Sequence, residues 1–228
     1  MSNGKPSPHE LPDASGLVVG VLGGTGDQGR GLARRFAGAG HRVMIGSRRA
    51  TRAESVARDL GLDKVGGVGN AACARESDVV IVAVPWEGHR ALLDSLAPDL
   101  EGKIVVDCVN PLGFDQRGAY ALHVGEGSAA EQAAALLPNS TVVAAFHHVS
   151  AVMLNDASVE EIDCDVLVLG DDREATDLVQ ALAGRVPRMR GIYAGRLRNA
   201  GQVEALTANL VSVNRRYKAH AGLRVTDV

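Results

Sequence analysis

The chain has 228 residues, a formal net charge of −3 and 46% hydrophobic residues, so it is long and apolar enough to bury a core. Aromatic residues make up only 3% and there is no long basic run, which argues against nucleic acid as a partner. No apolar stretch approaches the roughly 20 residues that a membrane helix needs. The widely spaced Cys73, Cys108 and Cys164 are typical of reduced thiols in a cytoplasmic protein.

Short apolar runs alternate with helical patterns along most of the chain. Residues 1–15 contain three prolines among polar neighbours, and we expect them to form a flexible extension. Residues 110–127, which are rich in glycine and turn formers, are expected to form a long loop. The predicted strands cover 17–22, 42–45, 78–84, 103–107, 141–146, 165–170 and 188–193. The predicted helices cover 29–39, 49–60, 70–76, 87–96, 128–137, 173–183 and 198–219.

This alternation predicts an α/β protein with a Rossmann-type, doubly wound and mostly parallel sheet. A boundary near Ser150 divides it into two parts. Residues 16–150 are predicted to form the nucleotide-binding domain, and residues 151–228 a smaller C-terminal α/β domain that packs against the open end of the sheet.

A glycine-rich loop follows the first predicted strand and opens the first helix. Gly24, Gly26 and Gly29 fit the pattern G-x-G-x-x-G, in which the glycines permit a tight turn, close approach of a pyrophosphate, and close packing of helix on strand. Backbone N–H groups at the start of the helix then face the phosphates. The loop therefore predicts a dinucleotide site.

The end of the second predicted strand identifies the dinucleotide. An NAD-binding protein places Asp or Glu there for the ribose 2′-hydroxyl, whereas this chain has Ser47 and Arg48, with Arg52 one helical turn later. A hydroxyl and two guanidinium groups suit a 2′-phosphate, which a carboxylate would repel. We therefore predict NADP(H) rather than NAD(H).

Three further strand ends should meet the dinucleotide at the same edge of the sheet. Trp86, after the predicted strand 78–84, is either a ligand contact or a packing residue. Asn110 either bonds a ligand or forms a turn with Pro111. His147 and His148 follow another strand, and we expect one of them to line the pocket. No Cys or carboxylate accompanies this pair at metal-ligand spacing, so no metal site is predicted.

Several segments together resemble the NADPH-dependent reductases of the deazaflavin coenzyme F420. They are Leu-Gly-Gly-Thr-Gly at 22–26, Gly-Ser-Arg-Arg at 46–49, Pro-Trp-Glu at 85–87, Ser-Ala-Ala-Glu at 128–131, VAAFHHVSA at 143–151, Gly-Asp-Asp at 170–172 and Val-Glu-Ala-Leu-Thr at 203–207. The resemblance covers roughly residues 17–228. It implies reversible hydride transfer between NADP(H) and coenzyme F420, in a homodimer whose C-terminal domain completes the deazaflavin pocket.

The resemblance also implies which residues bind the two ligands. By matching position, the dinucleotide contacts fall on Thr25, Gly26, Asp27, Gln28, Ser47, Arg48, Arg52, Val84, Asn110 and Ala151. The deazaflavin pocket would include His147 and Val149.

Hydride transfer between two stacked rings depends on orientation, and the ligands carry the electronics. We therefore assign no catalytic residue and expect the protein to act by positioning. Two other functions remain open on the residues alone. An NADPH-dependent imine or ketone reductase would need a proton donor, for which the candidates are His147, His148, Tyr120 and Tyr217. A non-catalytic NADP(H) sensor would bind the nucleotide without oxidising it.

Overall fold

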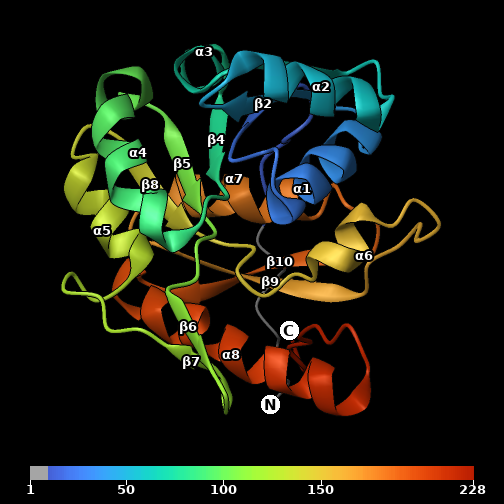
Figure 1. The fold of residues 1–228 in the computed structure, drawn as a ribbon, viewed down its shortest axis with the longest axis vertical. Coiled ribbons are helices and arrows are strands. Elements are labelled where there is room, and N and C mark those ends of the chain that lie inside the picture. Colours follow the sequence, from blue (N-terminus) through green and yellow to red (C-terminus); the bar gives the residue numbers. More distant parts are fainter. Residues whose placement is uncertain (1–9) are drawn as a thin grey trace, which may run out of the picture.

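The computed structural model describes residues 10–228, and one eight-stranded sheet runs through them (Figure 1). Its strands are β1 (Val18–Leu22), β2 (Arg42–Ser47), β3 (Val65–Gly69), β4 (Val79–Val82), β5 (Ile104–Asp107), β8 (Thr141–Ala144), β9 (Cys164–Gly170) and β10 (Met189–Gly195). They are ordered β10-β9-β8-β5-β4-β1-β2-β3. Every pairing from β8 across to β3 is parallel, β9 is antiparallel to β8, and β10 is parallel to β9. The predicted α/β fold with a mostly parallel sheet is confirmed.

Helices cover both faces of this sheet. They are α1 (Asp27–Gly38), α2 (Ala50–Leu60), α3 (Asn70–Glu76), α4 (Trp86–Leu100), α5 (Ala129–Leu136), α6 (Ala151–Asn155), α7 (Arg173–Ala183), the 3-10 helix η1 (Leu197–Asn199) and α8 (Ala200–Tyr217). In Figure 1, α4 and α5 lie to the left of the sheet, α1 and α6 lie to its right, and α8 passes below. Among residues 10–228, no helix is long and apolar enough to cross a membrane.

The hydrophobic core consists of two clusters, one on each face of the sheet. One cluster joins α1, α2 and α7 to the sheet and includes Phe36 and Phe146, whose rings meet edge to face at 5.8 Å. The other joins α3, α4 and α5 to the opposite face. Ala14 is 2% exposed and belongs to the first cluster, so the end of the predicted N-terminal extension packs onto the body. Residues 1–9, the rest of that prediction, lie outside the described residues.

The strand β3 was missed by sequence reasoning because its sequence, Val-Gly-Gly-Val-Gly, has too few side chains to show an apolar pattern. The structure explains these glycines at Gly67, where an added Cβ would lie 2.2 Å from the carbonyl carbon of Ala53 in α2. The helix therefore packs directly on the strand backbone, which only glycine permits.

The prediction of a long loop over 110–127 was wrong for residues 112–121. This segment contains an antiparallel hairpin of β6 (Leu112–Asp115) and β7 (Gly118–Ala121). The carboxylate of Asp115 closes the turn by accepting hydrogen bonds from the N–H groups of Arg117 and Gly118 at 2.7 and 3.2 Å. Gly118 has a φ of +121°, which suits glycine. β7 packs against α8.

The sheet continues across the predicted domain boundary near Ser150, because β9 and β10 extend the edge that β8 begins. The division into domains 16–150 and 151–228 therefore remains a prediction. Ser150 instead caps the short helix α6, where its hydroxyl accepts a hydrogen bond from the N–H of Met153.

The C-terminal tail is held to the sheet by one buried carboxylate. Asp165, at 0% exposure in β9, accepts two hydrogen bonds from the guanidinium of Arg190 at 2.7 and 2.6 Å. It also accepts from Arg224 at 2.7 Å and from the N–H of Val225 at 2.7 Å. These bonds bring the chain after α8 back along the edge of the sheet.

We expect Asp165→Asn to lower the free energy of unfolding at pH 7 by about 2–3 kcal/mol, because the negative charge is lost and an N–H₂ group replaces one oxygen that accepts from arginine. The Arg190 hydrogen bonds lower the pKa of the Asp165 carboxyl below its ordinary 3.8. A lowered folded-state pKa stabilises the protein above pH 4, and this contribution is lost as the pH falls through the lowered value. Urea unfolding at pH 7 and pH 3 should therefore show that the difference in free energy of unfolding between wild type and variant is smaller at pH 3.

The control for this prediction is Asp163→Asn, which removes a half-exposed carboxylate that contacts Arg188 and Arg224. Such surface pairs contribute about 0–1 kcal/mol. Equal losses in the two variants would contradict the central role given to Asp165.

Candidate functional site

The glycine loop is shaped by close backbone contacts. Gly23, after β1, has a φ of +77°, and a Cβ there would lie 2.4 Å from the carbonyl oxygen of Ala83. A Cβ on Gly29 would lie 2.7 Å from the carbonyl oxygen of Gly23. Gly26 precedes α1 without a side-chain cap, so the first turn of the helix leaves N–H groups for an anion. These features fit a dinucleotide pyrophosphate.

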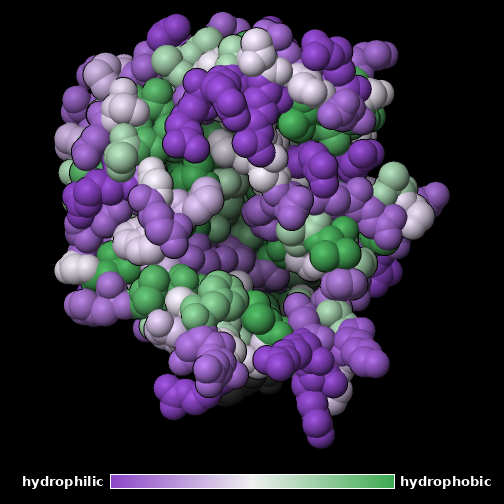
Figure 2. Space-filling view, viewed as in Figure 1, coloured by the Kyte–Doolittle hydropathy of each residue, from purple (hydrophilic) through white to green (hydrophobic). Residues whose placement is uncertain are grey.

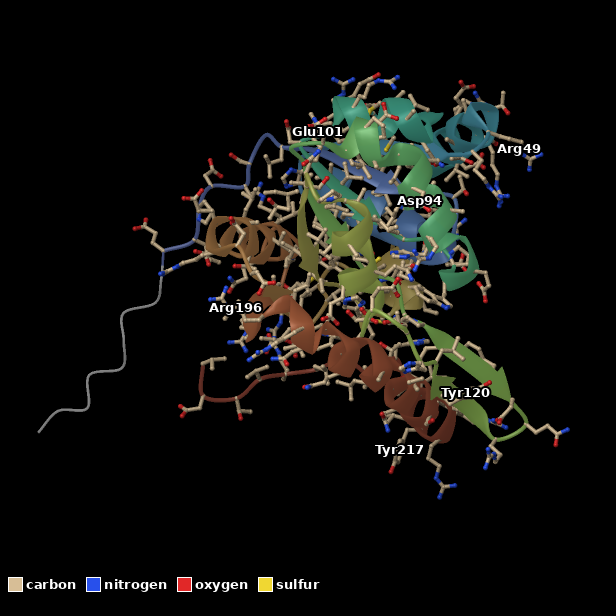
Figure 3. The ribbon with its side chains drawn as sticks, turned by 90° about the vertical axis from the view of Figure 1, so that its left-hand side faces the viewer. Arg49, Asp94, Glu101, Tyr120, Arg196 and Tyr217 are labelled. Carbon is tan, nitrogen blue, oxygen red and sulfur yellow. The ribbon has the colours of Figure 1, made fainter. Side chains whose placement is uncertain are left out.

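The predicted 2′-phosphate contacts lie at the end of β2 and the start of α2. Ser47 is partly buried, and its hydroxyl accepts a hydrogen bond from the N–H of Arg49 at 3.3 Å. The side chains of Arg48 and Arg52 are exposed, and neither forms an ion pair with any residue from 10 to 228. Figure 3 shows the neighbouring Arg49 at one end of the molecule, far from Tyr120 and Tyr217. We call this exposed surface of Ser47, Arg48 and Arg52 the arginine shelf. Its unpaired guanidinium groups fit a phosphate.

A cavity of about 470 Å³ lies at the carboxyl edge of the parallel strands. Figure 2 shows the recess across this face, between the body of the sheet and α8. Its lining brings together most of the residues predicted for the site: Gly26, Asp27, Gln28, Val84, Asn110, His147, Val149 and Ala151. Thr25, Ser47, Arg48 and Arg52 do not line it. The predicted residues thus divide between a cavity and the exposed arginine shelf.

Other lining residues were missed by sequence reasoning. One set comes from α8, where Thr207, Leu210, Val211 and Asn214 follow the i, i+3, i+4, i+7 spacing of a single helical face. That spacing was readable in the sequence, although nothing showed which partner the face would meet. His220 and Ala221 also line the cavity. They return to it because the Asn214 side chain accepts a hydrogen bond from the N–H of Ala221 at 2.6 Å.

Asn110 connects three elements at the cavity wall. Its amide donates a hydrogen bond to the carbonyl oxygen of His147 at 2.8 Å. The hydroxyl of Thr207 lies 3.3 Å from the same carbonyl oxygen and 3.4 Å from Oδ1 of Asn110. The amide N–H₂ of Asn110 is therefore engaged with the protein, whichever ligand the residue also contacts.

The two histidines are placed by a strained turn after β8. Phe146 has a φ of +64°, an uncommon conformation for an aromatic residue, and its carbonyl oxygen accepts a hydrogen bond from Gln28 at 3.2 Å. His147 and His148 are 3% and 4% exposed, so both are buried at the cavity. The sequence predicts that one of them lines the ligand pocket, and both lie along the cavity.

Burial lowers the pKa of both imidazoles to about 4, so both are neutral at neutral pH. Within residues 10–228, neither ring nitrogen of His147 has a partner at good hydrogen-bond geometry, although backbone groups of Cys108 and Val109 lie near enough to act on its pKa. His148 accepts a hydrogen bond at Nε2 from the N–H of Leu167 at 3.3 Å. An unpartnered polar ring at a cavity leaves donor and acceptor positions for a ligand.

Groups of three or more His, Cys, Asp and Glu side chains that could hold a metal ion do not occur within residues 10–228. Cys73, Cys108 and Cys164 are all buried free thiols. Burial raises the pKa of the Cys73 thiol to about 12 and raises that of Cys108 as well, which makes these thiols unreactive.

Known proteins resemble this chain over nearly its whole length. A sequence model of the family described as "NADP oxidoreductase coenzyme F420-dependent" matches residues 18–111. The F420-dependent NADP reductase of Methanothermobacter marburgensis is 39% identical in an alignment 226 residues long, which covers 93% of this chain and 99% of the relative. The protein of the same description from Methanocaldococcus jannaschii is 36% identical over 93% of this chain and 99% of its own.

Among solved structures, a proposed F420-dependent NADP reductase from Arthrobacter sp. FB24 superimposes with a TM-score of 0.79 at 26% identity. The superposition covers 92% of this chain and 100% of the other. On the identity and coverage of its relatives, the chain belongs to the family of F420-dependent NADP reductases.

Proposed function

We propose that this protein is an NADPH:F420 oxidoreductase, which transfers a hydride reversibly between NADP(H) and coenzyme F420. One observation carries the proposal beyond the family relationship. The cavity begins at Gly26 beside the nucleotide loop and extends to the α8 face that includes Thr207 and Leu210. A dinucleotide on the glycine loop therefore leads into a space with a second wall, where another flat ring can stack.

NADPH supplies the hydride and the deazaflavin accepts it, so the chain's own contribution is to bind and orient both rings. The helix start at Gly26 holds the pyrophosphate, and Ser47, Arg48 and Arg52 hold the 2′-phosphate. Asn110 and Thr207 fix the wall around the carbonyl of His147.

The neutral histidines favour this function over imine or ketone reduction. Reduction of an imine or ketone needs a proton donor near the product nitrogen or oxygen. His147 and His148 have pKa values near 4 and carry no extra proton to give at neutral pH. Tyr120 and Tyr217 do not line the cavity. The second cavity wall formed by α8 leaves space for a second ligand, which a sensor that binds only NADP(H) does not need.

We also propose that the protein is a cytoplasmic homodimer. The support for pairing is a set of exposed aromatic side chains on the β6–β7 hairpin and at the end of α8, namely Phe114, Tyr120 and Tyr217, which are 69%, 48% and 74% exposed. Figure 2 shows hydrophobic residues over the β6–β7 hairpin and α8, below the recess. Surfaces of this kind commonly mark protein interfaces. The three free thiols suit a reducing compartment.

The proposed function predicts that the protein with NADPH bleaches oxidised coenzyme F420. The measurement is the loss of the deazaflavin's visible absorbance, with parallel reactions that contain flavin mononucleotide or a cyclic imine. Turnover should require the deazaflavin. Bound NADPH that no acceptor oxidises would instead indicate a sensor, and turnover of the imine alone would indicate an imine reductase.

The arginine shelf predicts how nucleotide choice changes. We expect the double variant Arg48→Gln/Arg52→Gln to weaken NADPH binding by about 1.5–3 kcal/mol, the usual contribution of hydrogen bonds to charged groups. This corresponds to a roughly 10- to 100-fold increase in Kd. The Kd of NADH should stay the same, because it lacks the 2′-phosphate.

Arg58→Gln is the matched control for the shelf, since Arg58 is an exposed arginine near the other end of the same helix. Its Kd for NADPH should equal that of the wild type. A loss of NADH and NADPH affinity in equal measure by the double variant would show that the two arginines do not read the 2′-phosphate.

If the protein orients the two rings and donates no proton, His147→Ala should lower kcat only modestly. We expect kcat to fall by less than about tenfold, because no proton transfer is lost. The wild-type rate should show no ionisation of His147 between pH 6 and 9, since its pKa lies near 4. Steady-state rates and the Kd values of both ligands provide the check. Abolished turnover with unchanged affinities would give His147 a chemical role.

A further inference from the structure

A chain of polar side chains runs from the surface into the core behind the cavity. Arg90 contacts Glu126, and the other oxygen of Glu126 accepts a hydrogen bond from Nε2 of Gln132 at 3.1 Å. Oε1 of Gln132 lies 3.0 Å from Nδ1 of His89. Nε2 of His89 lies 2.6 Å from Oδ2 of Asp107. His89 and Asp107 are both completely buried, in α4 and at the end of β5.

The order of donors and acceptors along this chain defines the state of His89. An ionised Glu126 only accepts hydrogen bonds, so the amide N–H₂ of Gln132 must face it. The amide oxygen of Gln132 then faces His89, and Nδ1 must donate. Because the carboxylate of Asp107 also accepts, Nε2 donates as well. His89 is therefore a buried imidazolium paired with a carboxylate.

The electrostatics agree with this assignment. Burial alone lowers the pKa of His89, but the hydrogen bond and charge of Asp107 outweigh it, and the pKa is raised above 6.5. Glu204 on α8 lies close enough to act in the same direction. Its own carboxyl caps α5 by accepting from the N–H groups of Ala129 and Ala130 at 2.9 and 3.2 Å. Burial raises the pKa of Glu204 to about 7.

The second oxygen of Asp107 connects this pair to the cavity. Oδ1 accepts a hydrogen bond from the N–H of Val109 at 2.9 Å, which shapes the turn that leaves β5. Cys108, Val109 and Asn110 of that turn line the cavity, and Asn110 in turn holds the carbonyl of His147. No atom of His89 or Asp107 needs to touch a ligand for the pair to set the shape of this wall.

We propose that the His89–Asp107 ion pair is a positioning element for hydride transfer. It fixes the turn at residues 108–110 and, through Asn110, the cavity wall at His147 and His148. The inference rests on the proposed function. The proposal therefore predicts that the rate of hydride transfer and the affinity for NADPH can be changed separately. The phosphates bind at Gly26 and Arg48, away from the pair, so disturbing it lowers the rate of transfer while the affinity for NADPH is kept.

Two substitutions of Asp107 separate its geometry from its charge. In Asp107→Asn, one side-chain oxygen still accepts from Val109, and the new N–H₂ donates to Nε2 of a neutral His89, so every hydrogen bond is kept. In Asp107→Ala, the turn and the partner of His89 are both lost. Asp94→Ala, which removes an exposed carboxylate from α4, is the control.

The experiment measures kcat with NADPH and oxidised coenzyme F420, both saturating, per mole of folded protein, and the Kd of NADPH by fluorescence. We expect Asp107→Asn to stay within about threefold of wild type and Asp107→Ala to lose tenfold or more in kcat. Small misplacements of reacting groups have effects of this size. The Kd of NADPH should change by less than about twofold in both.

A readout besides activity tests the ionic state. Nitrogen-15 NMR of the imidazoles, assigned with His89→Gln, should show both ring N–H groups of His89 in wild type at a pH where a free imidazole has lost one of them, and only one in Asp107→Asn. A His89 that is singly protonated in the wild type at that pH would overturn the ion pair. Unchanged kcat in folded Asp107→Ala, beside an active wild type, would reduce the pair to a stabilising contact. An inactive wild type would instead sink the proposed function together with the transfer role.

Discussion

The hydrogen bond from the Asn110 amide to the carbonyl oxygen of His147 joins elements that are distant in the sequence. At 2.8 Å it couples the turn after β5 to the turn after β8, and Thr207 attaches α8 to the same point. Parallel strands bring their carboxyl ends to one edge of a sheet in any Rossmann-type protein. This bond goes further, because it sets the distance between two neighbouring turns. The far wall of the cavity therefore depends on a side chain whose sequence context, Asn before Pro, equally suits a simple turn.

The parts of the site that could be predicted are those encoded locally. The turn at Gly23 and the helix packing at Gly29 need a missing Cβ, and that need is visible as glycine at fixed spacing. The proposed 2′-phosphate role of Ser47 and Arg48 follows from residue type at one strand end, without any knowledge of distant contacts. Most of the strands that the sequence predicts have apolar side chains buried on both faces, such as Val79–Val82.

The parts that could not be predicted depend on what packs against what. β3 has glycines where α2 packs directly on its backbone. Its sequence therefore lacks the apolar side chains by which a strand is usually predicted. The β6–β7 hairpin is held by Asp115 and by α8, which the sequence places almost a hundred residues later. His89 and Asp107 lie on a helix and a strand, and nothing in either local sequence shows that they meet at 2.6 Å. Their partnership exists only once α4 covers β5.

Charge is distributed differently at the arginine shelf and at the cavity wall formed by His147 and His148. The requirements of hydride transfer explain this difference. At the shelf, Arg48 and Arg52 stand exposed in water, where an unpaired cation costs little until a phosphate arrives. At the transfer end, burial keeps His147 and His148 neutral, since a cation there would be costly and would repel the nicotinamide as it becomes positive. The charged pair of His89 with Asp107, which lies behind that wall, is balanced within itself. In the proposed function, charges at the arginine end supply binding free energy, while the histidine end contributes fixed geometry in a neutral environment.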